Sequence, residues 1–444
     1  MNWTRLTGLA LATALCAGCN SGSRSSNKAY FGPGSTGSAA AATSGAGGGA
    51  TNPGGTPGGG ASAGQFAASA ALNNARYQFT ATVLTDGRVL VVGGTDGQGL
   101  ITESELFDPQ ASAWTLVSNL VTNQADGYLI DATGAFATVR QLHQATKLVD
   151  GRVLITGGFG AERLDANQQP VGEMLKGAWM FDPASNAFSK MADMPENRGW
   201  HEAALLSNGQ VLVAGGMDQN MAASLQTSSA YDNGANTWSA PAQMGSKHTW
   251  GAALTCGNVT LIVGGVDVTG GQQGLQISGL PAPRVELFNA QASQWQSGND
   301  NADHVFNMGR ATDSQGKGFL AGGQGIDQQA GTVKILDTIE VFDNVASTWS
   351  TNAAVLQIPR IVPEVAELST SSDMLITGGV DANGTPLADC EVWSVLYNTI
   401  IGTVSMAQER VDHRAVKLND GRVMVIGGQD ATQAALDTTE IHTR

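Results

Sequence analysis

Short apolar runs end in a Gly-Gly pair at seven places along the chain, and this recurrence constrains the fold more than any other feature. Consecutive pairs begin 64, 58, 49, 58, 56 and 49 residues apart. A recurrence of roughly 40–50 residues is typical of proteins built from stacked or radially arranged repeats. The chain is therefore expected to fold as seven related units. The pairs are Gly93-Gly94, Gly157-Gly158, Gly215-Gly216, Gly264-Gly265, Gly322-Gly323, Gly378-Gly379 and Gly427-Gly428.

One unit consists of four short β-strands. In the shortest unit, residues 198–246, an Asn208-Gly209 turn separates two β-prone runs, and the second run ends at the Gly-Gly pair. Such a turn is a strong hairpin signal because both residues tolerate a positive φ. A variable loop follows, then an alternating third strand ending at Asp232. Six residues later Trp238 begins a fourth strand, and an aromatic residue recurs at this place in most units.

Four-stranded units with a Gly-Gly pair and a late aromatic residue resemble the kelch repeat of β-propellers. The resemblance covers residues 66–444 and implies an all-β fold, a seven-bladed kelch-type β-propeller with four antiparallel strands per blade. The first strand is degenerate in unit five (near Met308) and unit six (near Val362).

The seventh unit lacks a fourth strand at its C-terminal end. Phe66 precedes Arg76 by the same interval that separates Phe188 from Arg198. We therefore expect residues 66–75 to supply the missing outer strand, so that the N-terminal strand closes the ring.

The N-terminal segment is expected to direct export. In residues 1–18 an apolar run is followed by Ala17-Gly18 and then Cys19, which resembles a bacterial lipoprotein signal peptide. The resemblance implies lipidation of Cys19, although Cys16 replaces the usual Leu three positions earlier. Ordinary secretion is the alternative. Residues 19–65 are rich in Gly, Ser and Ala and are expected to be a disordered tether. These features predict a protein of the bacterial cell envelope, anchored by lipid (at the outer membrane) or secreted.

Charge and cysteine content limit the partners. Without Arg5, Arg24 and Lys28 the chain keeps 20 basic against 38 acidic residues, a net charge of −18. This disfavours nucleic acids and anionic lipid surfaces, so membrane contact is expected only through the anchor, and the protein is expected to be a monomer. Cys256 and Cys390 lie in different units, which favours buried free thiols over a disulfide.

Loop lengths vary on one side of the expected propeller. In each unit two connections lie on the same side of the expected propeller: the one between the second and third strands, and the one to the next unit. We call this side the long-loop face. The loop after Gly158 runs about 19 residues and that after Gly265 about 20, whereas opposite turns are short. Neutral drift is the alternative, but drift should not prefer one side. We interpret the long-loop face as a binding face.

An Arg-x-x-His pattern recurs where the innermost strands begin, around the expected mouth of the central channel. Charge-assisted bonds from such a ring suit a carboxylate or a sugar acid. The alternatives are structural roles within each unit and a three-histidine metal site, and we expect no metal. The candidate ligand-binding residues are Arg76, Arg140, His143, Arg198, His201, Lys247, Trp250, Arg410 and His413.

An aspartate follows the Gly-Gly pair at a fixed offset in five units. Each lies in its own unit without the ligand spacing of a calcium loop, so we expect each to cap its own turn. They are Asp96, Asp218, Asp267, Asp381 and Asp430.

These patterns favour a binding or interaction scaffold over an enzyme. The repeats are similar to those of galactose oxidase, but its copper chemistry requires tyrosine ligands, and Leu142, Trp200 or Asp412 precedes each repeated histidine. No catalytic residues and no cofactor are therefore expected. The alternative is a carbohydrate-active enzyme such as a sugar-acid mutarotase, with His201 and Glu202, or Asp412 and His413, as acid and base. The expected ligand is a protein, a carbohydrate or a sugar acid.

Overall fold

The computed structural model describes residues 63–117, 121–122, 129–130, 139–160, 172–271, 274–279, 284–299, 306–327, 332–368 and 373–444. These residues form β-strands and turns and contain no α-helix. Accordingly, the described part of the chain has no helix long and apolar enough to cross a membrane. The predicted signal peptide (1–18), Cys19 and nearly all of the predicted tether (19–65) lie outside the described residues.

Seven main antiparallel sheets make up the described fold, six of four strands and one of five, and we number them 1 to 7. Sheets 1 to 4 are β2 (Thr80–Val83), β3 (Val89–Val92), β4 (Glu105–Asp108) and β5 (Ala113–Leu116); β9 (Gln144–Lys147), β10 (Val153–Thr156), β13 (Ala178–Asp182) and β14 (Ala187–Lys190); β15 (Glu202–Leu205), β16 (Val211–Ala214), β17 (Thr227–Asp232), β18 (Thr237–Trp238) and β19 (Ala242–Gln243); and β20 (Ala252–Cys256), β21 (Val259–Val263), β24 (Val285–Asn289) and β25 (Gln294–Ser297).

Sheets 5 to 7 repeat the four-stranded pattern, and the last combines strands from both ends of the chain. They are β26 (Gly309–Thr312), β27 (Gly318–Ala321), β30 (Thr338–Asp343) and β31 (Thr348–Val355); β32 (Glu364–Glu367), β33 (Met374–Thr377), β34 (Asp389–Ser394) and β35 (Thr399–Ser405); and β36 (Arg414–Lys417), β37 (Val423–Ile426), β38 (Thr439–Thr443) and β1 (Gln65–Ala68).

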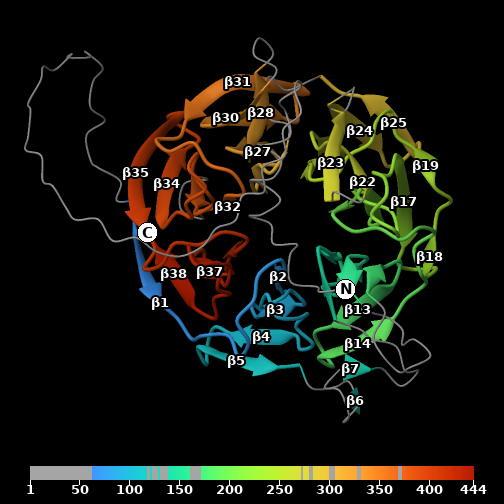
Figure 1. Ribbon diagram of the computed structural model, residues 1–444, viewed down its shortest axis with the longest axis horizontal. Helices are drawn as coiled ribbons and strands as arrows, with labels where there is room; N and C mark the ends of the chain where they lie inside the picture. Colours follow the sequence, from blue (N-terminus) through green and yellow to red (C-terminus); the bar gives the residue numbers. More distant parts are fainter. Residues whose placement is uncertain are drawn as a thin grey trace, which may run out of the picture.

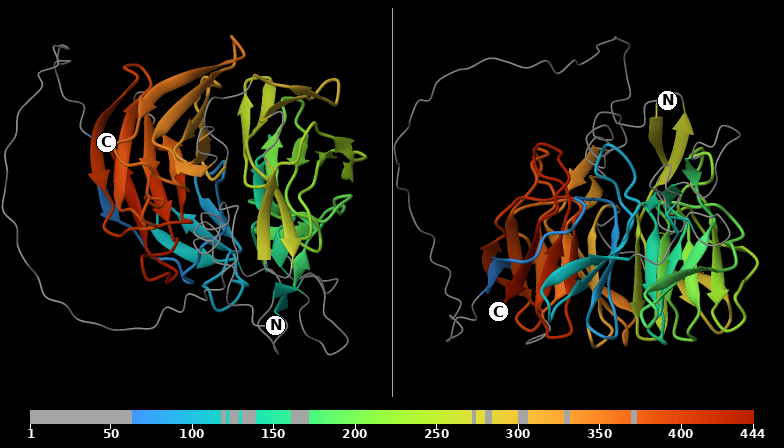
Figure 2. Two further views of the ribbon diagram at one scale, coloured as in Figure 1. Left: turned by 45° about the horizontal axis from the view of Figure 1, so that its top comes forward. Right: turned by 90° about the horizontal axis from the view of Figure 1, so that it is seen from below.

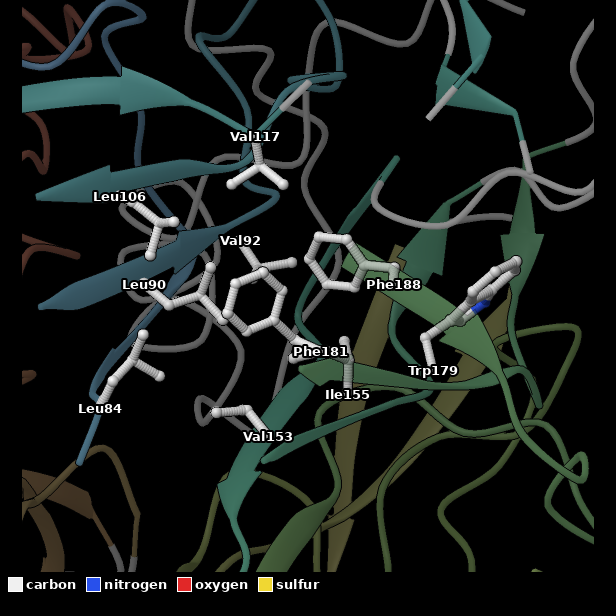
Figure 3. Packing of buried hydrophobic residues seen from close by; sticks show 10 residues of the cluster. All are labelled: Leu84, Leu90, Val92, Leu106, Val117, Val153, Ile155, Trp179, Phe181 and Phe188. Carbon is white, nitrogen blue, oxygen red and sulfur yellow. The ribbon is translucent and has the colours of Figure 1, made fainter. Parts of the chain in front are cut away.

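The sheets are set around a common centre, as in a β-propeller (Figure 1). Their innermost strands, β2, β9, β15, β20, β26, β32 and β36, contact one another in this order, and β36 contacts β2. Adjacent sheets share apolar cores. Between sheets 1 and 2, for example, Leu90 and Val92 face Ile155 and Phe181 (Figure 3). Burial of such apolar surface between sheets is the main force that holds the arrangement together.

Each sheet also carries a cross-strand pair between its third and fourth strands, at the aromatic positions of the repeat. Register places Phe107 opposite Trp114 and Tyr231 opposite Trp238, with ring centroids 5.2 and 5.0 Å apart. In sheet 6 the partner of Trp393 is Ile400. These pairs explain why the aromatic residue recurs six positions after the third strand.

The Gly-Gly pairs join neighbouring sheets. Gly93 and Gly94 have φ angles of 63° and 96°, and the N–H of Gly94 donates to the carbonyl of Arg140 at 2.8 Å, in the next sheet. A Cβ on Gly93 would clash with that same carbonyl. Glycine is therefore required both by the left-handed backbone and by the close approach of the next sheet.

The strand β1 pairs with β38 over Gln65–Ala68, antiparallel to residues 440–443. The sequence analysis expected residues 66–75 to pair with the C-terminal segment. The pairing is present, but over fewer residues, and it begins at Gln65 rather than Phe66. Beyond Ala68 individual backbone bonds continue, from Ser69 to Thr439, from Leu72 to Asp437 and from Arg76 to Leu436.

Candidate ligand-binding site

One non-glycine residue with a positive φ precedes the innermost strand of every sheet. Their φ angles lie between 53° and 64°, a left-handed region that L-residues adopt rarely. Each of these residues is half-buried, whereas the residue that follows it is buried. We call this set the αL ring: Gln78, Leu142, Trp200, Trp250, Asn307, Val362 and Asp412.

Backbone hydrogen bonds connect members of the αL ring from sheet to sheet. The N–H of Trp200 donates to the carbonyl of Leu142 at 3.1 Å, and the N–H of Val362 donates to the carbonyl of Asn307 at 2.8 Å. The left-handed conformation thus directs a backbone N–H toward the preceding sheet. The conformation serves the fold, while the side chain at each position remains available for another role.

All seven αL ring residues line one cavity at the centre of the sheets, with a volume of about 440 Å³. This lies within the roughly 300–1,000 Å³ of small-molecule sites in proteins. The rest of the lining comes from residues that immediately precede or belong to the innermost strands, among them His143, His201, Glu202 and Arg310. The cavity therefore lies among the innermost strands, and of the predicted binding residues its described lining includes His143, His201 and Trp250.

Charged groups in the cavity wall are paired. Arg310 bonds to Glu202 at 3.1 Å, and Arg414 bonds to Glu364 at 2.8 Å. Burial raises the pKa of Glu202 despite the nearby Arg310. Burial likewise raises the pKa of Asp412, against the charge of Arg414 and a hydrogen bond from Gln78.

The four arginines predicted to bind a ligand are buried inside the sheets, and the described cavity lining includes none of them. The guanidinium of Arg76 donates to the carbonyls of Gly93 and Glu103 and to Glu105. Arg140, Arg198 and Arg410 likewise donate to the carbonyl of the first glycine of their own Gly-Gly pair. These contacts agree with the structural alternative for the arginines, because each guanidinium group is buried and donates to carbonyls of its own sheet.

A carboxylate accompanies most of these cations. Arg410 pairs with Glu440 at 2.7 Å from the third strand of its own sheet. In sheet 3 the corresponding third-strand residue is Ser229, and Arg198 bonds to Glu196 at 2.9 Å instead. Burial lowers the pKa of Arg198 to about 10, which Glu196 offsets only in part.

The three predicted histidines connect neighbouring sheets. Nε2 of His143 bonds to Thr80 at 2.9 Å, Nε2 of His201 to Thr156 at 3.0 Å, and Nε2 of His413 to Thr377 at 2.8 Å. Each histidine therefore bonds to the sheet before its own. Burial holds the pKa of all three histidines well below the usual value, with the neighbouring arginine acting in the same direction.

The described residues also bear on the metal and acid–base alternatives. They contain no group of three or more His, Cys, Asp or Glu side chains placed to hold a metal ion. The histidines of the two proposed acid–base pairs, His201 with Glu202 and Asp412 with His413, are each directed to a threonine of the preceding sheet.

In sheet 4 the predicted alignment was one residue out of register. The carbonyl that receives the N–H of Gly216 belongs to His248, so His248 occupies the place of the arginine and bonds to Glu286 at 2.8 Å. Lys247 instead pairs with Asp267 at 3.2 Å, and Trp250 belongs to the αL ring. The assignment of Lys247 and Trp250 to the Arg and His positions was therefore wrong.

Sequence reasoning also missed Arg360. It is buried in sheet 6 and bonds to Glu391 at 2.7 Å, although this unit was interpreted as degenerate in its first strand. The signal was available, because Arg360 precedes Gly378 by 18 residues while Arg410 precedes Gly427 by 17.

Four of the five aspartates that follow the Gly-Gly pairs cap their own turns, as expected. Oδ1 of Asp96 accepts the N–H groups of Gln98 and Gly99, and Oδ1 of Asp430 accepts those of Thr432 and Ala434. Asp218 and Asp381 do the same in their turns. Asp267 is the exception, since its pairing with Lys247 replaces the cap. Cys256 and Cys390 are buried free thiols, as predicted.

The long-loop face carries additional strand pairs. β11 (Phe159–Gly160) and β12 (Glu173–Met174) form a small sheet with β8 (Arg140–Gln141), while β22 (Asp267–Gly271) pairs with β23 (Gly274–Gly279), and β28 (Gln324–Asp327) with β29 (Thr332–Ile335). β6 (Val121–Thr122) and β7 (Leu129–Ile130) pair in the connection from sheet 1 to sheet 2. Figure 2 shows the β22–β23 hairpin, in yellow, projecting beyond the main sheets on one side.

Comparison with known proteins supports a kelch-type β-propeller. No protein-family model matches the chain. Kelch-like protein 35 of Mus musculus is 24% identical over 209 residues, which is 47% of this chain and 29% of that protein. The kelch repeat-containing protein kel-10 of Caenorhabditis elegans is 22% identical over 206 residues, 46% of this chain and 31% of that protein. The chain thus spans about a third of the length of these curated relatives.

Two solved structures share the fold. YjhT is 16% identical with a TM-score of 0.50, covering 75% of this chain and 98% of its own. A fungal alcohol oxidase of the AA5 family, in complex with copper, is 14% identical with a TM-score of 0.60, covering 86% of this chain and 76% of its own. At these identities the likeness to the two structures concerns the fold alone, and what the chain shares with the kelch proteins is the repeat architecture.

Proposed function

We propose that this protein is an extracytoplasmic binding module, a closed seven-bladed kelch-type propeller that binds a protein partner through its long-loop face. The seven main sheets act as the blades, and β1 completes the last one. The cyclic contacts of the innermost strands and the pairing of β1 with β38 support this closure. The signal-like residues 1–18 and Cys19 support export and lipid anchoring.

The observation that carries the proposal is the fixed position of the β22–β23 hairpin. Thr269 of the hairpin forms a β-bridge with Ala223 in the loop of sheet 3, and the N–H of Gly270 donates to the carbonyl of Ala222 at 3.0 Å. The N–H of Val268 donates to Ser224 Oγ at 2.7 Å. Long loops held in one conformation by their neighbours form a preorganised surface, which lowers the entropic cost of binding.

The charge of this face indicates the kind of partner. Asp96, Asp218, Asp381 and Asp430 use Oδ1 to cap their turns, which leaves their carboxylates at the rim of the long-loop face. With the net negative charge of the whole chain, −15, this favours a partner with a basic surface. Association should therefore weaken as salt is raised.

Photo-cross-linking in cells tests the proposal. A photoreactive amino acid is placed at exposed Gln98 or Gln276 on the long-loop face and, as matched controls, at exposed Ser207 or Gln291 on the opposite side. We expect one protein adduct from the long-loop positions only, with a yield that falls in about 0.5 M salt. Equal adducts from both sides, or none from Gln98 and Gln276, would contradict the proposal.

A further inference from the structure

The αL ring has an apolar half and a polar half. Following the sheets around the centre, Leu142, Trp200 and Trp250 come from three consecutive sheets, 2 to 4. The remaining members, from sheets 5, 6, 7 and 1, are Asn307, Val362, Asp412 and Gln78, so this half is polar except at Val362. None of the seven is glycine, although glycine adopts this conformation without strain. All seven positions thus carry a side chain although the left-handed conformation is unfavourable for residues other than glycine. Such strained residues often cluster at binding or active sites.

The apolar half is built as a rigid wall. The rings of Trp200 and Trp250 lie 6.0 Å apart at an angle of 85°. Both pack against a cluster beneath the long loops that includes Met174, Met217 and Val266. Because the indole rings are held from behind and remain half-exposed toward the cavity, they present fixed apolar surface to a ligand.

The polar half offers hydrogen-bond acceptors without partners. Gln78 Oε1 and Asp412 Oδ2 are both buried, and neither has a hydrogen-bond partner among the described residues. Buried polar atoms are normally bonded, so each such atom requires an explanation. A ligand that satisfies both must present hydrogen-bond donors to one side of the cavity while its other side lies on the indole rings.

The charges of the cavity disfavour an anion. Arg310 and Arg414 already pair with Glu202 and Glu364, and Asp412 adds a third carboxyl group. His143 and His201 contribute no positive charge, since burial holds their pKa values well below neutrality. A cation is also disfavoured, because the two guanidinium groups of Arg310 and Arg414 lie in the same wall.

We propose that the central cavity is a binding site for a neutral saccharide unit, with the C–H face of the sugar on Trp200 and Trp250 and its hydroxyls donating to Asp412 and Gln78. A sugar ring combines an apolar face with several hydroxyl donors, as the two halves of the αL ring require. This site goes beyond the proposed function, since it takes a small ligand in the cavity rather than a protein on the long loops.

The test is titration of the mature protein with sugars while tryptophan fluorescence is recorded. The probes are neutral methyl glycosides and N-acetylglucosamine, with glucuronate and N-acetylneuraminate as anionic sugars and choline as a cation. We expect saturable binding of at least one neutral sugar, tenfold or more tighter than either anionic sugar. Tighter binding of a sugar acid or of choline, or no binding of any neutral sugar, would overturn the proposal.

Two kinds of variant link binding to the αL ring. Trp250→Ala removes apolar wall and Asp412→Asn replaces one unpartnered acceptor by a donor, and each is expected to weaken sugar affinity at least tenfold. Trp238→Phe, in the outer strand β18, should leave affinity unchanged. Melting curves identify variants that fail to fold. Asp412→Asn is expected to fold, because asparagine tolerates the left-handed backbone conformation. If the folded Asp412→Asn variant binds the sugar as tightly as the wild type, the proposed site is wrong.

These experiments separate the two proposals. If no neutral sugar binds but Gln98 and Gln276 still cross-link to a protein, only the cavity proposal fails. If a sugar binds but neither position cross-links, only the proposal for the long-loop face fails.

Discussion

Phe66 of β1 lies opposite His442 of β38, with ring centroids 5.1 Å apart and planes at 61°. These two residues, from opposite ends of the chain, occupy in sheet 7 the positions that Phe107 and Trp114 occupy in sheet 1. His442 Nε2 also bonds to the carbonyl of Ala63 at 2.7 Å. The repeat pattern therefore continues across the junction of the two termini.

Truncating Phe66 is expected to destabilise the whole protein. Phe66→Ala removes the edge-to-face contact and part of an apolar core shared with sheet 6, at a cost of about 1–3 kcal/mol. Deletion of residues 63–75 should lower the melting temperature further, since it also removes the pairing with β38. Thermal melts measure both, with Gln65→Ala at an exposed position of β1 as the control. A melting temperature unaffected by the deletion would show that β1 does not close the fold.

The fold was predictable because its signals recur at fixed intervals. The Gly-Gly pairs and the aromatic residues of the fourth strands each satisfy a geometric requirement, and the seven copies reinforce one another. Even the pairing of the termini followed from an interval, that between Phe66 and Arg76. The sequence indicated the extra hairpins of the long-loop face only as long loops. Their strands, such as β22 and β28, could not be predicted because they are not part of the repeat pattern.

The site was harder to predict, for two physical reasons. Arg198 and its counterparts look like ligands in sequence, but their guanidinium groups reach back to carbonyls of their own sheet. The αL ring was invisible as a set, since Gln78, Trp250 and Asp412 share a backbone conformation and no chemistry. Lys247 was assigned to the arginine position, whereas His248 takes that position in the structure through its hydrogen bond to Glu286.

Removing one partner of a buried ion pair is expected to be costly. Arg360→Ala leaves Glu391 buried without its cation, and we expect a loss of about 3–5 kcal/mol in the free energy of unfolding. Arg422→Ala breaks a pair with Asp420 that is partly exposed, with 38% and 48% side-chain exposure, and should cost less than about 1 kcal/mol. Denaturant unfolding measures both.

The double variant Arg360→Leu/Glu391→Met provides the control for this ion pair. It removes both charges and should recover much of the stability lost in Arg360→Ala. Equal losses for Arg360→Ala and Arg422→Ala would contradict a structural role for the buried pair.

Lipid anchoring is tested at Cys19. Cys19→Ala should abolish incorporation of labelled fatty acid and shift the protein from the detergent-soluble membrane fraction to the aqueous fraction, because the anchor would be the sole membrane attachment. Cys16→Ala is the matched control and should retain the label, since only the residue after Ala17-Gly18 is expected to be modified. Retention of the label by Cys19→Ala would exclude this site of lipidation.

Acid should destabilise the protein through its buried histidines. Burial lowers the pKa of His143, His201 and His413 well below the usual histidine value of about 6.5. Between that value and their lower folded pKa the unfolded chain binds more protons, so stability rises with pH in this window and falls as pH drops below about 6.5. Above pH 7 the three residues are neutral in both states and contribute no pH dependence.

The decisive measurement is the free energy of unfolding at several pH values from about 7.5 to 5, above the range in which most carboxylates titrate. The wild type should lose stability steadily below pH 6.5, by up to about 1.4 kcal/mol per pH unit for each histidine. The glutamine of His201→Gln does not titrate in this pH range. The unfolding free energy of this variant should therefore fall less steeply with decreasing pH, by the contribution of one histidine, even if the variant is less stable than the wild type at pH 7.5. Parallel profiles for the wild type and His201→Gln would mean that His201 titrates normally in the folded protein and does not remain neutral against Thr156.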